Sequence, residues 1–458
     1  MSIDVLIADD SMYLRKSIAD ILKEHDLINI VDYAKDGIEA VKFVKKYSPD
    51  VLVLDLVMPK MNGLDAFKLI MEGHPTPTVI LSAISPKNLD SSIQALLMGA
   101  FDYIIKPGGL GAKDLPRFRE ELLAKVLLAS QSQIKRIFKT EENLLSKRKS
   151  LRQEMIDRIF DFGQYINQLK PIEEIEEKRE IDSFEIMKVK AILKDEIKPA
   201  VIDETSSKTE IKSTKKLEGE ISSKIQSKSS ESLKILKTRK QKLASVLDNK
   251  KKEVASIPDL SPVRGFALTS NVIVMGASVG GPRTITTILR EIPRNYNTPI
   301  LIVQHLSSHF TEAFADNLNM ECELEIKVAK NGDQLQSGQV YIAPGDKHME
   351  ITVDNKTPSI KIYKGAPVNF CMPSIDVLFF SAAKIFRNRA MGILLTGMGS
   401  DGVEGLGAIK RVGGKTISEA EETCILYAMP KFAVEKGFAD FILPNYEIKD
   451  QITKFIKN

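Results

Sequence analysis

The sequence contains no tryptophan, only 6% aromatic residues and three cysteines among its 458 residues. Cys322, Cys371 and Cys424 lack the spacing of a metal site and cannot all pair, so we expect buried thiols in a reducing compartment. No apolar run is long enough to cross a bilayer, and the first expected strand begins almost at Met1. Neither membrane insertion nor a secretory leader is therefore expected, and the cytoplasm is the predicted location.

A long segment poor in aromatic residues divides the chain. Residues 201–260 hold 14 Lys and Arg against 9 Asp and Glu, together with 11 serines. No aromatic residue occurs between Phe184 and Phe266. Such a segment buries too little apolar surface to offset its ordering entropy, so we expect a linker. The predicted division is a folded domain at 1–125, a helix and charged linker at 126–262, and a second folded domain at 263–458.

An amphipathic helix is expected between Lys139 and Lys170, because apolar residues recur there at spacings of three and four. A helix docked on one of the domains is favoured over a coiled-coil dimer seam, since fewer than three or four clean heptads are visible. The lysines that follow could suggest a nucleic-acid partner. They lack aromatic interleaving, and no helix-turn-helix pattern occurs in the C-terminal part, so no nucleic-acid partner is expected.

The first 125 residues alternate short apolar runs with longer amphipathic stretches. The runs are IDVLIA, DVLVLD, PTVILS and DYIIK. This alternation is typical of a doubly wound parallel sheet.

Five polar residues fall where these strands end: Asp9, Asp10, Asp55, Ser82 and Lys106. Clustered carboxylates repel one another unless a cation lies among them, and Mg²⁺ binds to a few carboxylates while keeping waters and a phosphate oxygen. A carboxylate at such a site could accept a phosphoryl group, with the lysine and the serine hydroxyl receiving its oxygens. The simpler interpretations are a helix N-cap for the Asp pair and an ordinary turn at Lys106-Pro107.

The joint order of DD, LDLVMPKMNGLD, ILSA and IIKP resembles the receiver domain of two-component response regulators, which has a flavodoxin-like fold. The resemblance implies that Asp55 is the phosphoacceptor and that a sensor histidine kinase is the phosphodonor. It implies a Mg²⁺ site formed by Asp9, Asp10, Asp55 and the Val57 carbonyl. It also implies switch roles for Ser82, Lys106 and the aromatic residue Tyr103.

From Asn271 onward the strand–helix alternation resumes. Candidate strands are NVIVM, PILIVQ, QVYIAP, HMEITV, IKIY, AMGILLT and KTIS, with helices at roughly 282–292, 309–319, 374–386 and 402–411. A second, mostly parallel α/β sheet is predicted, mixed at one edge.

A candidate nucleophile follows the first of these strands. Residues 276–280 fit G-x-S-x-G, with a strand before Ser278 and a helix after it. This turn exposes the serine at a helix N-terminus, where free N–H groups can stabilise an oxyanion. Glycine-rich turns more often bind phosphates, but this one lacks the lysine of a P-loop.

A serine nucleophile needs a base and a group that orients the base. His305 ends a strand and ranks ahead of His309 and His348, either of which could instead contact substrate or have a structural role. Asp401 follows a strand in a glycine-rich turn and could also N-cap the helix after it. Asp376 is the competitor and ranks lower, because it falls inside an expected helix.

The motifs GASVGGP, VQHLSSHFT, YIAPGDKHM, MPSIDVLF, LLTGMGSDG and ETCILYAMPK resemble the catalytic domain of chemotaxis protein-glutamate methylesterases of the CheB type. The resemblance implies Ser278 as nucleophile, His305 as general base and acid, and Asp401 as its orienting partner. Backbone N–H groups near Met398 would contribute to the oxyanion hole. No cofactor is expected in this domain. Val279 stands where many members have threonine, and the linker exceeds the family's usual hinge.

The implied reaction is hydrolysis of glutamyl methyl esters, and deamidation of glutamines, on the cytoplasmic helices of methyl-accepting chemoreceptors. The unphosphorylated receiver is hypothesised to cover the cleft, and phosphorylation of Asp55 to weaken that contact. Two other hypotheses remain: a non-catalytic or DNA-binding response regulator whose second domain merely resembles an esterase, and a serine esterase for small metabolites with a deep apolar pocket.

Overall fold

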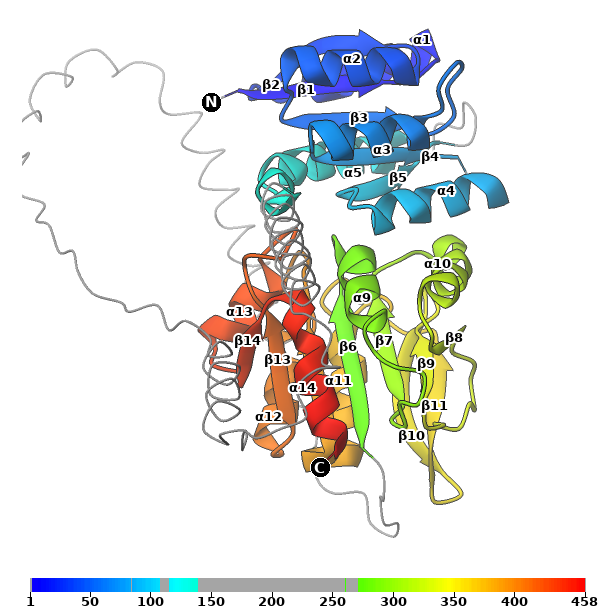
Figure 1. Ribbon diagram of the computed structural model, residues 1–458, viewed down its shortest axis with the longest axis vertical. Coiled ribbons are helices and arrows are strands. Elements are labelled where there is room, and N and C mark those ends of the chain that lie inside the picture. Colours follow the sequence, from blue (N-terminus) through cyan, green and yellow to red (C-terminus); the bar gives the residue numbers. More distant parts are fainter. Residues whose placement is uncertain (1, 84, 108–114, 139–259, 261–270, 458) are drawn as a thin grey trace, which may run out of the picture. The chain divides into compact units, whose positions relative to one another are not determined.

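The computed structural model describes residues 2–83, 85–107, 115–138, 260 and 271–457 (Figure 1). The helix predicted between Lys139 and Lys170 and nearly all of the predicted linker lie outside the described residues. In the described ranges, no helix combines the length and apolarity needed to span a membrane.

The N-terminal domain alternates strands and helices as predicted. Its elements are β1 (Ile3–Ala8), α1 (Met12–Leu22), β2 (Ile28–Ala34), α2 (Gly37–Tyr47), β3 (Val51–Asp55), α3 (Gly63–Gly73), β4 (Thr78–Ser82), α4 (Pro86–Leu97), β5 (Asp102–Ile105) and α5 (Leu115–Ser130). The strands pair in parallel in the order β2-β1-β3-β4-β5. In this order the chain reverses direction across the sheet between β1 and β3, where ligands of such folds bind.

The C-terminal domain is a second parallel α/β fold. Its elements are β6 (Val272–Ala277), α9 (Gly281–Leu289), β7 (Ile300–Gln304), α10 (Ser308–Glu321), β8 (Glu325–Val328), β9 (Gln339–Ile342), β10 (His348–Asp354), β11 (Thr357–Tyr363), α11 (Ile375–Phe386), η2 (Arg387–Arg389), β12 (Ala390–Leu394), α12 (Val403–Arg411), β13 (Lys415–Glu419), α13 (Met429–Glu435), β14 (Phe441–Leu443) and α14 (Asn445–Lys457). Seven of its strands form one sheet in the order β14-β13-β12-β6-β7-β9-β8.

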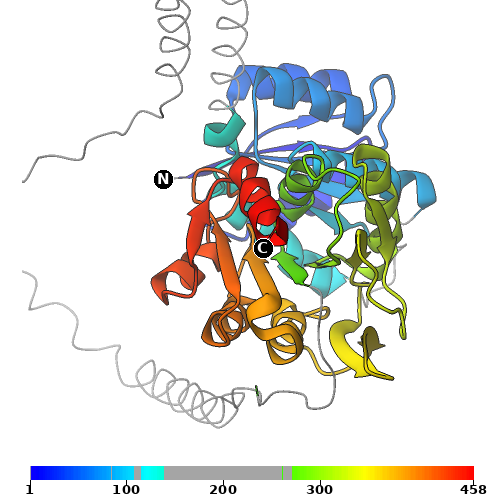
Figure 2. The ribbon, with the colours of Figure 1, turned by 60° about the horizontal axis from the view of Figure 1, so that its bottom comes forward.

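Each face of this sheet has its own apolar cluster. Along β6, Ile273 and Met275 belong to one cluster while Val272 and Val274 belong to the other, because successive side chains of a strand point to opposite faces. Helices α9, α10 and α14 contribute to the first cluster, and α11, α12 and α13 to the second. Helices α9 and α14 lie side by side in both views (Figure 2).

The prediction of a mixed edge in this sheet was wrong. All pairings among its seven strands are parallel, and the antiparallel strands β10 and β11 form a separate two-stranded sheet. The turn that joins them explains the difference. Asn355 and Lys356 both have positive φ, the geometry of a tight two-residue hairpin, so β10 and β11 satisfy each other's backbone groups.

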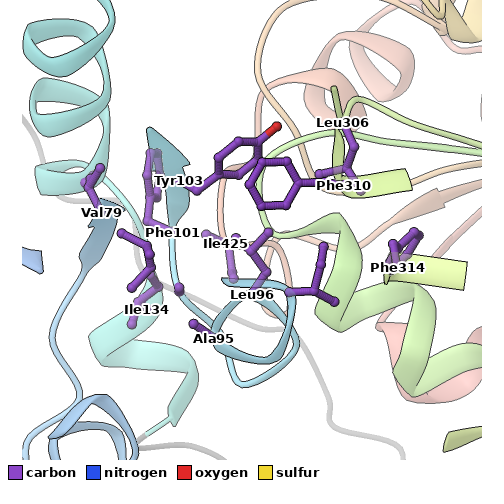
Figure 3. Close-up of a cluster of buried hydrophobic side chains, with 14 of the residues drawn as sticks. Val79, Ala95, Leu96, Phe101, Tyr103, Ile134, Leu306, Phe310, Phe314 and Ile425 are labelled. Atoms are coloured by element: carbon purple, nitrogen blue, oxygen red, sulfur yellow. The ribbon is translucent and has the colours of Figure 1, made fainter. Parts of the chain in front are cut away.

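The first apolar cluster continues from the N-terminal domain into the C-terminal domain, and the two belong to one compact unit. Helix α4 contacts α9 and α10, and the rings of Tyr103 and Phe310 lie 3.9 Å apart between their centroids (Figure 3). Leu96, Phe101 and Ile425 lie in the same cluster. The core of the N-terminal domain is thereby packed against the helices next to the candidate catalytic residues.

Candidate active site and receiver site

Ser278 lies in the turn between β6 and α9, at the carboxyl end of a central strand. Its backbone N–H donates to the Thr396 carbonyl at 3.0 Å. Helix α9 begins without a side-chain cap just after the serine, and its first N–H, from Gly281, donates to the Ser278 carbonyl at 2.9 Å. Gly280 has φ +78°, and a Cβ there would lie 2.6 Å from Ile425 Cβ. The glycine predicted from the motif is thus required both by backbone conformation and by space.

His305 and Asp401 are in direct contact. His305 Nε2 lies 2.9 Å from Asp401 Oδ2, although 96 residues separate them. Burial would lower the pKa of His305, but its hydrogen bonds to Asp401 and Cys371 and their charges outweigh this and raise the pKa to about 9. Burial would raise the pKa of Asp401, yet His305 and the surrounding donors hold it below its ordinary value. This pair therefore favours an imidazolium beside a carboxylate.

The Asp401 carboxylate is held by the start of another helix. It accepts from Ser374 Oγ at 2.7 Å, from Ile375 N at 2.7 Å and from Asp376 N at 3.2 Å. The alternative role predicted for Asp401, the N-cap of the following helix, was wrong. The cap position of α12 is Gly402, and the Asp401 side chain instead satisfies the free N–H groups of α11.

Asp376 lies next to Asp401 in the first turn of α11 and has other partners. It accepts from Gly405 N at 2.6 Å and from Asn369 Nδ2 at 2.6 Å. Burial and the nearby Asp401 charge raise the pKa of Asp376 to about 7. In the geometry described, His305 is paired with Asp401 rather than with Asp376.

The other two histidine candidates lie apart from this pair. His348 is buried, with Nε2 3.0 Å from the Ala366 carbonyl and Nδ1 accepting from Ser374 N at 3.3 Å. His309 is exposed on α10. Neither ring contacts Asp401 among the interactions of the described residues.

Ser278 and His305 line one small cavity of about 30 Å³. In the described ranges Ser278 Oγ has no hydrogen bond, so the two side chains share the cavity without direct bonding. Leu96, Phe101 and Asp102 of the N-terminal domain line the same cavity. A space of this size holds a water molecule but not a glutamyl side chain.

The loop after β12 lies against the nucleophile turn. A Cβ on Gly397 would lie 2.6 Å from Ser278 Cβ, which shows how closely the two turns approach. Met398, the predicted oxyanion contributor, follows directly and is half exposed. The position is compatible with the predicted role of its backbone N–H.

Several residues of the site were missed from the sequence. Cys371 Sγ lies 3.9 Å from His305 Nδ1, and Asn369 Nδ2 donates to Asp401 Oδ1 at 3.2 Å. Glu419 is fully buried and accepts from the N–H of Thr396 at 2.8 Å, the same residue whose carbonyl accepts from Ser278 N. The one available signal was the asparagine of the NFC sequence at 369–371, because asparagine is typical of short turns.

The expectation of three buried cysteines was partly wrong. Cys424 is buried, but Cys322 and Cys371 are half-buried. Cys371 lies in a loop beside the His305–Asp401 pair, and Cys322 lies at the end of α10, where it packs against the first apolar cluster without being fully buried.

The receiver carboxylates converge on one lysine. Lys106 Nζ lies 2.8 Å from Asp9 Oδ2 and 2.7 Å from Asp55 Oδ2. Burial raises the pKa of Asp55, the Lys106 charge opposes this, and Asp9 adds to it. Asp9 and Asp55 are buried, Asp10 is exposed, and oxygens of all three lie within 4.8 Å of one another. Such a set of hard oxygen ligands fits Mg²⁺.

The predicted switch residues lie at the neighbouring strand ends. Ser82 Oγ accepts from Ser92 Oγ at 2.8 Å. Tyr103 is buried, and its hydroxyl is within 3.3 Å of Ser307 Oγ, two residues after His305. Asn317 Nδ2 on α10 also donates to Asp90 Oδ1 on α4 at 2.9 Å. The tyrosine thus connects the receiver to the loop that carries the candidate base.

Two family models match the chain: CheB methylesterase over residues 273–452 and response regulator receiver domain over residues 5–112. The chain is 31% identical over 456 residues to the protein-glutamate methylesterase/protein-glutamine glutaminase of Methanococcus maripaludis, covering 99% of this chain and 98% of the relative. Its identity to the Pyrococcus horikoshii protein of the same name is 29% over 455 residues, covering 99% and 94%. The crystal structure of the Thermotoga maritima CheB methylesterase catalytic domain is 37% identical, covers 42% of this chain and 99% of that chain, and gives a TM-score of 0.40.

Proposed function

The chain belongs to the protein-glutamate methylesterase/protein-glutamine glutaminase family, and we propose that Ser278, His305 and Asp401 carry out its ester hydrolysis. The substrates proposed are glutamyl methyl esters, and glutamines, on the cytoplasmic helices of methyl-accepting chemoreceptors. The observation that carries this proposal is the His305–Asp401 contact of 2.9 Å at the edge of the cavity that Ser278 lines.

The first half of the reaction forms an acyl-enzyme. Ser278 Oγ attacks the ester carbonyl while His305 accepts its proton, and the Oγ–C bond forms. Asp401 holds Nε2, which leaves Nδ1 as the ring nitrogen for proton transfer. The C–O bond to the methoxy group then breaks, and the proton on His305 passes to the leaving oxygen to give methanol. With a glutamine substrate, ammonia leaves instead.

The second half returns the free enzyme. His305 takes a proton from water, the water oxygen attacks the acyl carbon, and the Oγ–C bond breaks with return of the proton to Ser278. In both halves the carbonyl oxygen becomes negative. The uncapped N-terminus of α9 and the backbone near Met398 are the groups proposed to stabilise it.

Control is proposed to come from the receiver. Asp9, Asp10, Asp55 and the Val57 carbonyl would hold Mg²⁺, which when bound neutralises charge on a phosphoryl group reaching Asp55. Lys106, which already contacts Asp55 at 2.7 Å, would bind that group's oxygens together with Ser82. The phosphodonor proposed is a sensor histidine kinase.

The geometry supports an inhibited unphosphorylated state. Receiver residues line the cavity at Ser278, and Tyr103 contacts the loop after His305. Asp401 and Cys371 raise the pKa of His305 to about 9, which favours the protonated ring and makes it a weaker acceptor for the Ser278 proton. Phosphorylation at Asp55 is proposed to move Tyr103, to release its contact with the loop after His305 and to uncover the cavity.

The division into a receiver at 1–125, a linker at 126–262 and a catalytic domain at 263–458 remains a proposal, as does a cytoplasmic location. We also propose that the catalytic domain uses no cofactor and that the protein has no nucleic-acid partner. The small cavity argues against a metabolite esterase with a deep apolar pocket in this state.

Labelling with a fluorophosphonate tests the nucleophile directly. We expect wild type treated with Mg²⁺ and acetyl phosphate to be modified at Ser278, with little labelling of Ser278→Ala or His305→Asn when intact mass and peptides are measured. Ser307→Ala serves as a control outside the proposed triad and should still be labelled at Ser278. Labelling at another serine, or equal labelling of Ser278→Ala, would contradict the assignment.

A further inference from the structure

Two groups of side chains in the described ranges could hold a metal ion, and they differ in chemistry. The receiver group offers only carboxylate oxygens, which are hard ligands and suit Mg²⁺. In the second group, His305, Cys371 and Asp401 offer a ring nitrogen, a sulfur and a carboxylate oxygen within 4.8 Å of one another. A thiolate and an imidazole favour softer cations such as Zn²⁺. Cysteine spacing along the chain predicted no such site, because His305 and Cys371 are 66 residues apart.

The two softer ligand atoms lie almost as far apart as two ligands of one zinc ion. Cys371 Sγ lies 3.9 Å from His305 Nδ1. With Zn–N bonds of about 2.0–2.1 Å and Zn–S bonds of about 2.3 Å, tetrahedral coordination separates the nitrogen from the sulfur by about 3.6 Å. A shift of a few tenths of an ångström therefore lets one ion contact both atoms.

Asp401 fixes the ring so that Nδ1 is the nitrogen available to an ion. Asp401 Oδ2 lies 2.9 Å from His305 Nε2, the other nitrogen of the ring. Histidines that bind metals usually donate their second ring N–H to such a partner, which fixes the tautomer and the ring orientation. The Asp401 carboxylate is itself held by donors at the start of α11, so its role is to orient the ligand rather than to bind the ion.

A short hairpin carries the thiol. Val368 and Cys371 pair through two backbone hydrogen bonds of 3.1 Å and 2.9 Å. Between them, Asn369 has φ +52° and Phe370 has φ +64°, the geometry of a tight turn. The left-handed region is unfavourable for phenylalanine, so this turn depends on contacts with the rest of the fold.

The Asn369 side chain provides these contacts. Its Nδ2 donates to Asp376 Oδ2 at 2.6 Å and to Asp401 Oδ1 at 3.2 Å. The turn that carries Cys371 is thereby tied to the same carboxylate that orients His305. Both ligand residues are only half-buried, so an ion can reach them from solvent.

We propose that His305 Nδ1 and Cys371 Sγ form an inhibitory binding site for Zn²⁺, with water in the remaining coordination positions. Binding releases the thiol proton and occupies the ring nitrogen that is proposed to accept the Ser278 proton. The ion is therefore an inhibitor and not a cofactor, and its removal restores the base. The site rests on the geometry alone, whereas the inhibition rests on the proposed function.

Alkylation measures occupation of the site without an assay of activity. Full-length wild type in excess Mg²⁺, which competes for the receiver carboxylates, is treated with iodoacetamide with and without Zn²⁺, and the modified peptides are quantified by mass spectrometry. We expect Zn²⁺ to slow alkylation of Cys371 about tenfold or more, since sulfur bound to the ion is not free to react. Cys322 is also half-buried but belongs to neither group, so its alkylation rate should stay the same and serves as an internal control. His305→Asn should lose the protection of Cys371.

Inhibition is measured as methanol release from methylated receptor membranes, with acetyl phosphate and Mg²⁺ present. Each protein is referred to its own rate without Zn²⁺. Zn²⁺ should inhibit wild type, and the zinc-selective chelator TPEN should restore the rate. Loss of even an outer-shell partner costs about 10–100-fold in metal affinity, so the Zn²⁺ concentration for half-inhibition should rise about tenfold or more in Cys371→Ala. It should stay unchanged in Cys322→Ala.

Equal alkylation of Cys371 with and without Zn²⁺ would overturn the site, and so would protection that persists in His305→Asn. Half-inhibition at the same Zn²⁺ concentration in wild type and Cys371→Ala would overturn the inhibitory role. Absence of methanol release by wild type would instead overturn the proposed function, while the alkylation result would still decide whether the site binds Zn²⁺.

Discussion

The hydroxyl of Tyr103 donates to Ser307 Oγ at 3.3 Å and accepts from the Ser307 backbone N–H at 3.2 Å, while the Tyr103 ring lies on Phe310. Ser307 follows His305 by two residues, so a receiver side chain is bonded to the loop that carries the candidate base. Any movement of Tyr103 changes the partners of that loop. Since a coupling of 1–3 kcal/mol is typical between communicating sites, this single contact can contribute a large part of the control.

Replacing Tyr103 with phenylalanine removes both hydrogen bonds but keeps the ring on Phe310. Each hydrogen bond contributes about 1 kcal/mol, so we expect the loss of both to raise basal methanol release without phosphodonor about thirtyfold. The further activation by acetyl phosphate should shrink by the same factor. Tyr33→Phe, at an exposed position on β2, is the control and should leave basal release unchanged. An unaltered basal rate in Tyr103→Phe would show that these hydrogen bonds do not restrain the site.

The pH dependence of activity should report His305. A base must be unprotonated, and the pKa of His305 is raised to about 9, with Cys371 among the causes. The kcat/KM of unphosphorylated protein should therefore increase with pH up to about 9. Cys371→Ala should move the midpoint of this rise to lower pH, whereas Cys322→Ala should not. A midpoint that stays fixed in Cys371→Ala would show that the thiol does not raise the pKa of His305.

The same pKa has a consequence for stability. The folded-state pKa of His305 lies above its ordinary value of 6.5, so the stabilisation it contributes is present below pH 6.5 and is lost as pH rises toward about 9. His305→Asn should lack this loss. The loss is measured by urea unfolding at pH 6 and pH 9. At each pH the free energy of unfolding of wild type is compared with that of His305→Asn. A difference that is the same at both pH values would contradict the raised pKa.

Glu419 should make the stability of the protein depend on pH. Burial raises the pKa of this carboxyl, so the unfolded chain loses its proton at lower pH than the folded chain. The contribution of Glu419 to the free energy of unfolding therefore falls as pH rises above the ordinary pKa of a glutamate. Glu419→Gln keeps an acceptor for Thr396 N and should gain stability relative to wild type as pH increases. The exposed Glu447→Gln is the control, and an equal pH trend in both variants would refute the effect.

Asp55→Asn should remove control without removing catalysis. The side chain keeps its size, and the phosphoacceptor oxygen is lost. We expect basal methanol release within twofold of wild type and no increase on adding acetyl phosphate with Mg²⁺. Asp65→Asn, at an exposed position in the first turn of α3, should respond like wild type. Full activation of Asp55→Asn would show that phosphorylation acts elsewhere.

Strand ends were the most predictable part of the molecule. Apolar runs that end in Asp9, Asp55, Ser278 and His305 are local signals, and parallel strands bring such ends to one edge of a sheet. The contact of Asp401 with the N-terminus of α11 could not be predicted in this way. The Asp401 carboxylate caps α11, which begins 26 residues earlier in the chain, and only the packed fold brings them together.

Contacts between the domains could not be predicted from the sequence either. Tyr103 and Ser307 are 204 residues apart, and no sequence pattern around either residue predicts their contact. The left-handed conformation of Phe370 was hidden for a different reason. Its residue type argues against that conformation, and only the tertiary hydrogen bonds of Asn369 impose it.

Methanol release from methylated receptor membranes, by wild type and Ser278→Ala with and without Mg²⁺ and acetyl phosphate, tests the central claim most directly. We predict release by wild type alone, with a severalfold increase on phosphorylation and none from Ser278→Ala under either condition. Equal release from the two proteins, with or without the phosphodonor, would contradict a serine esterase controlled by its receiver.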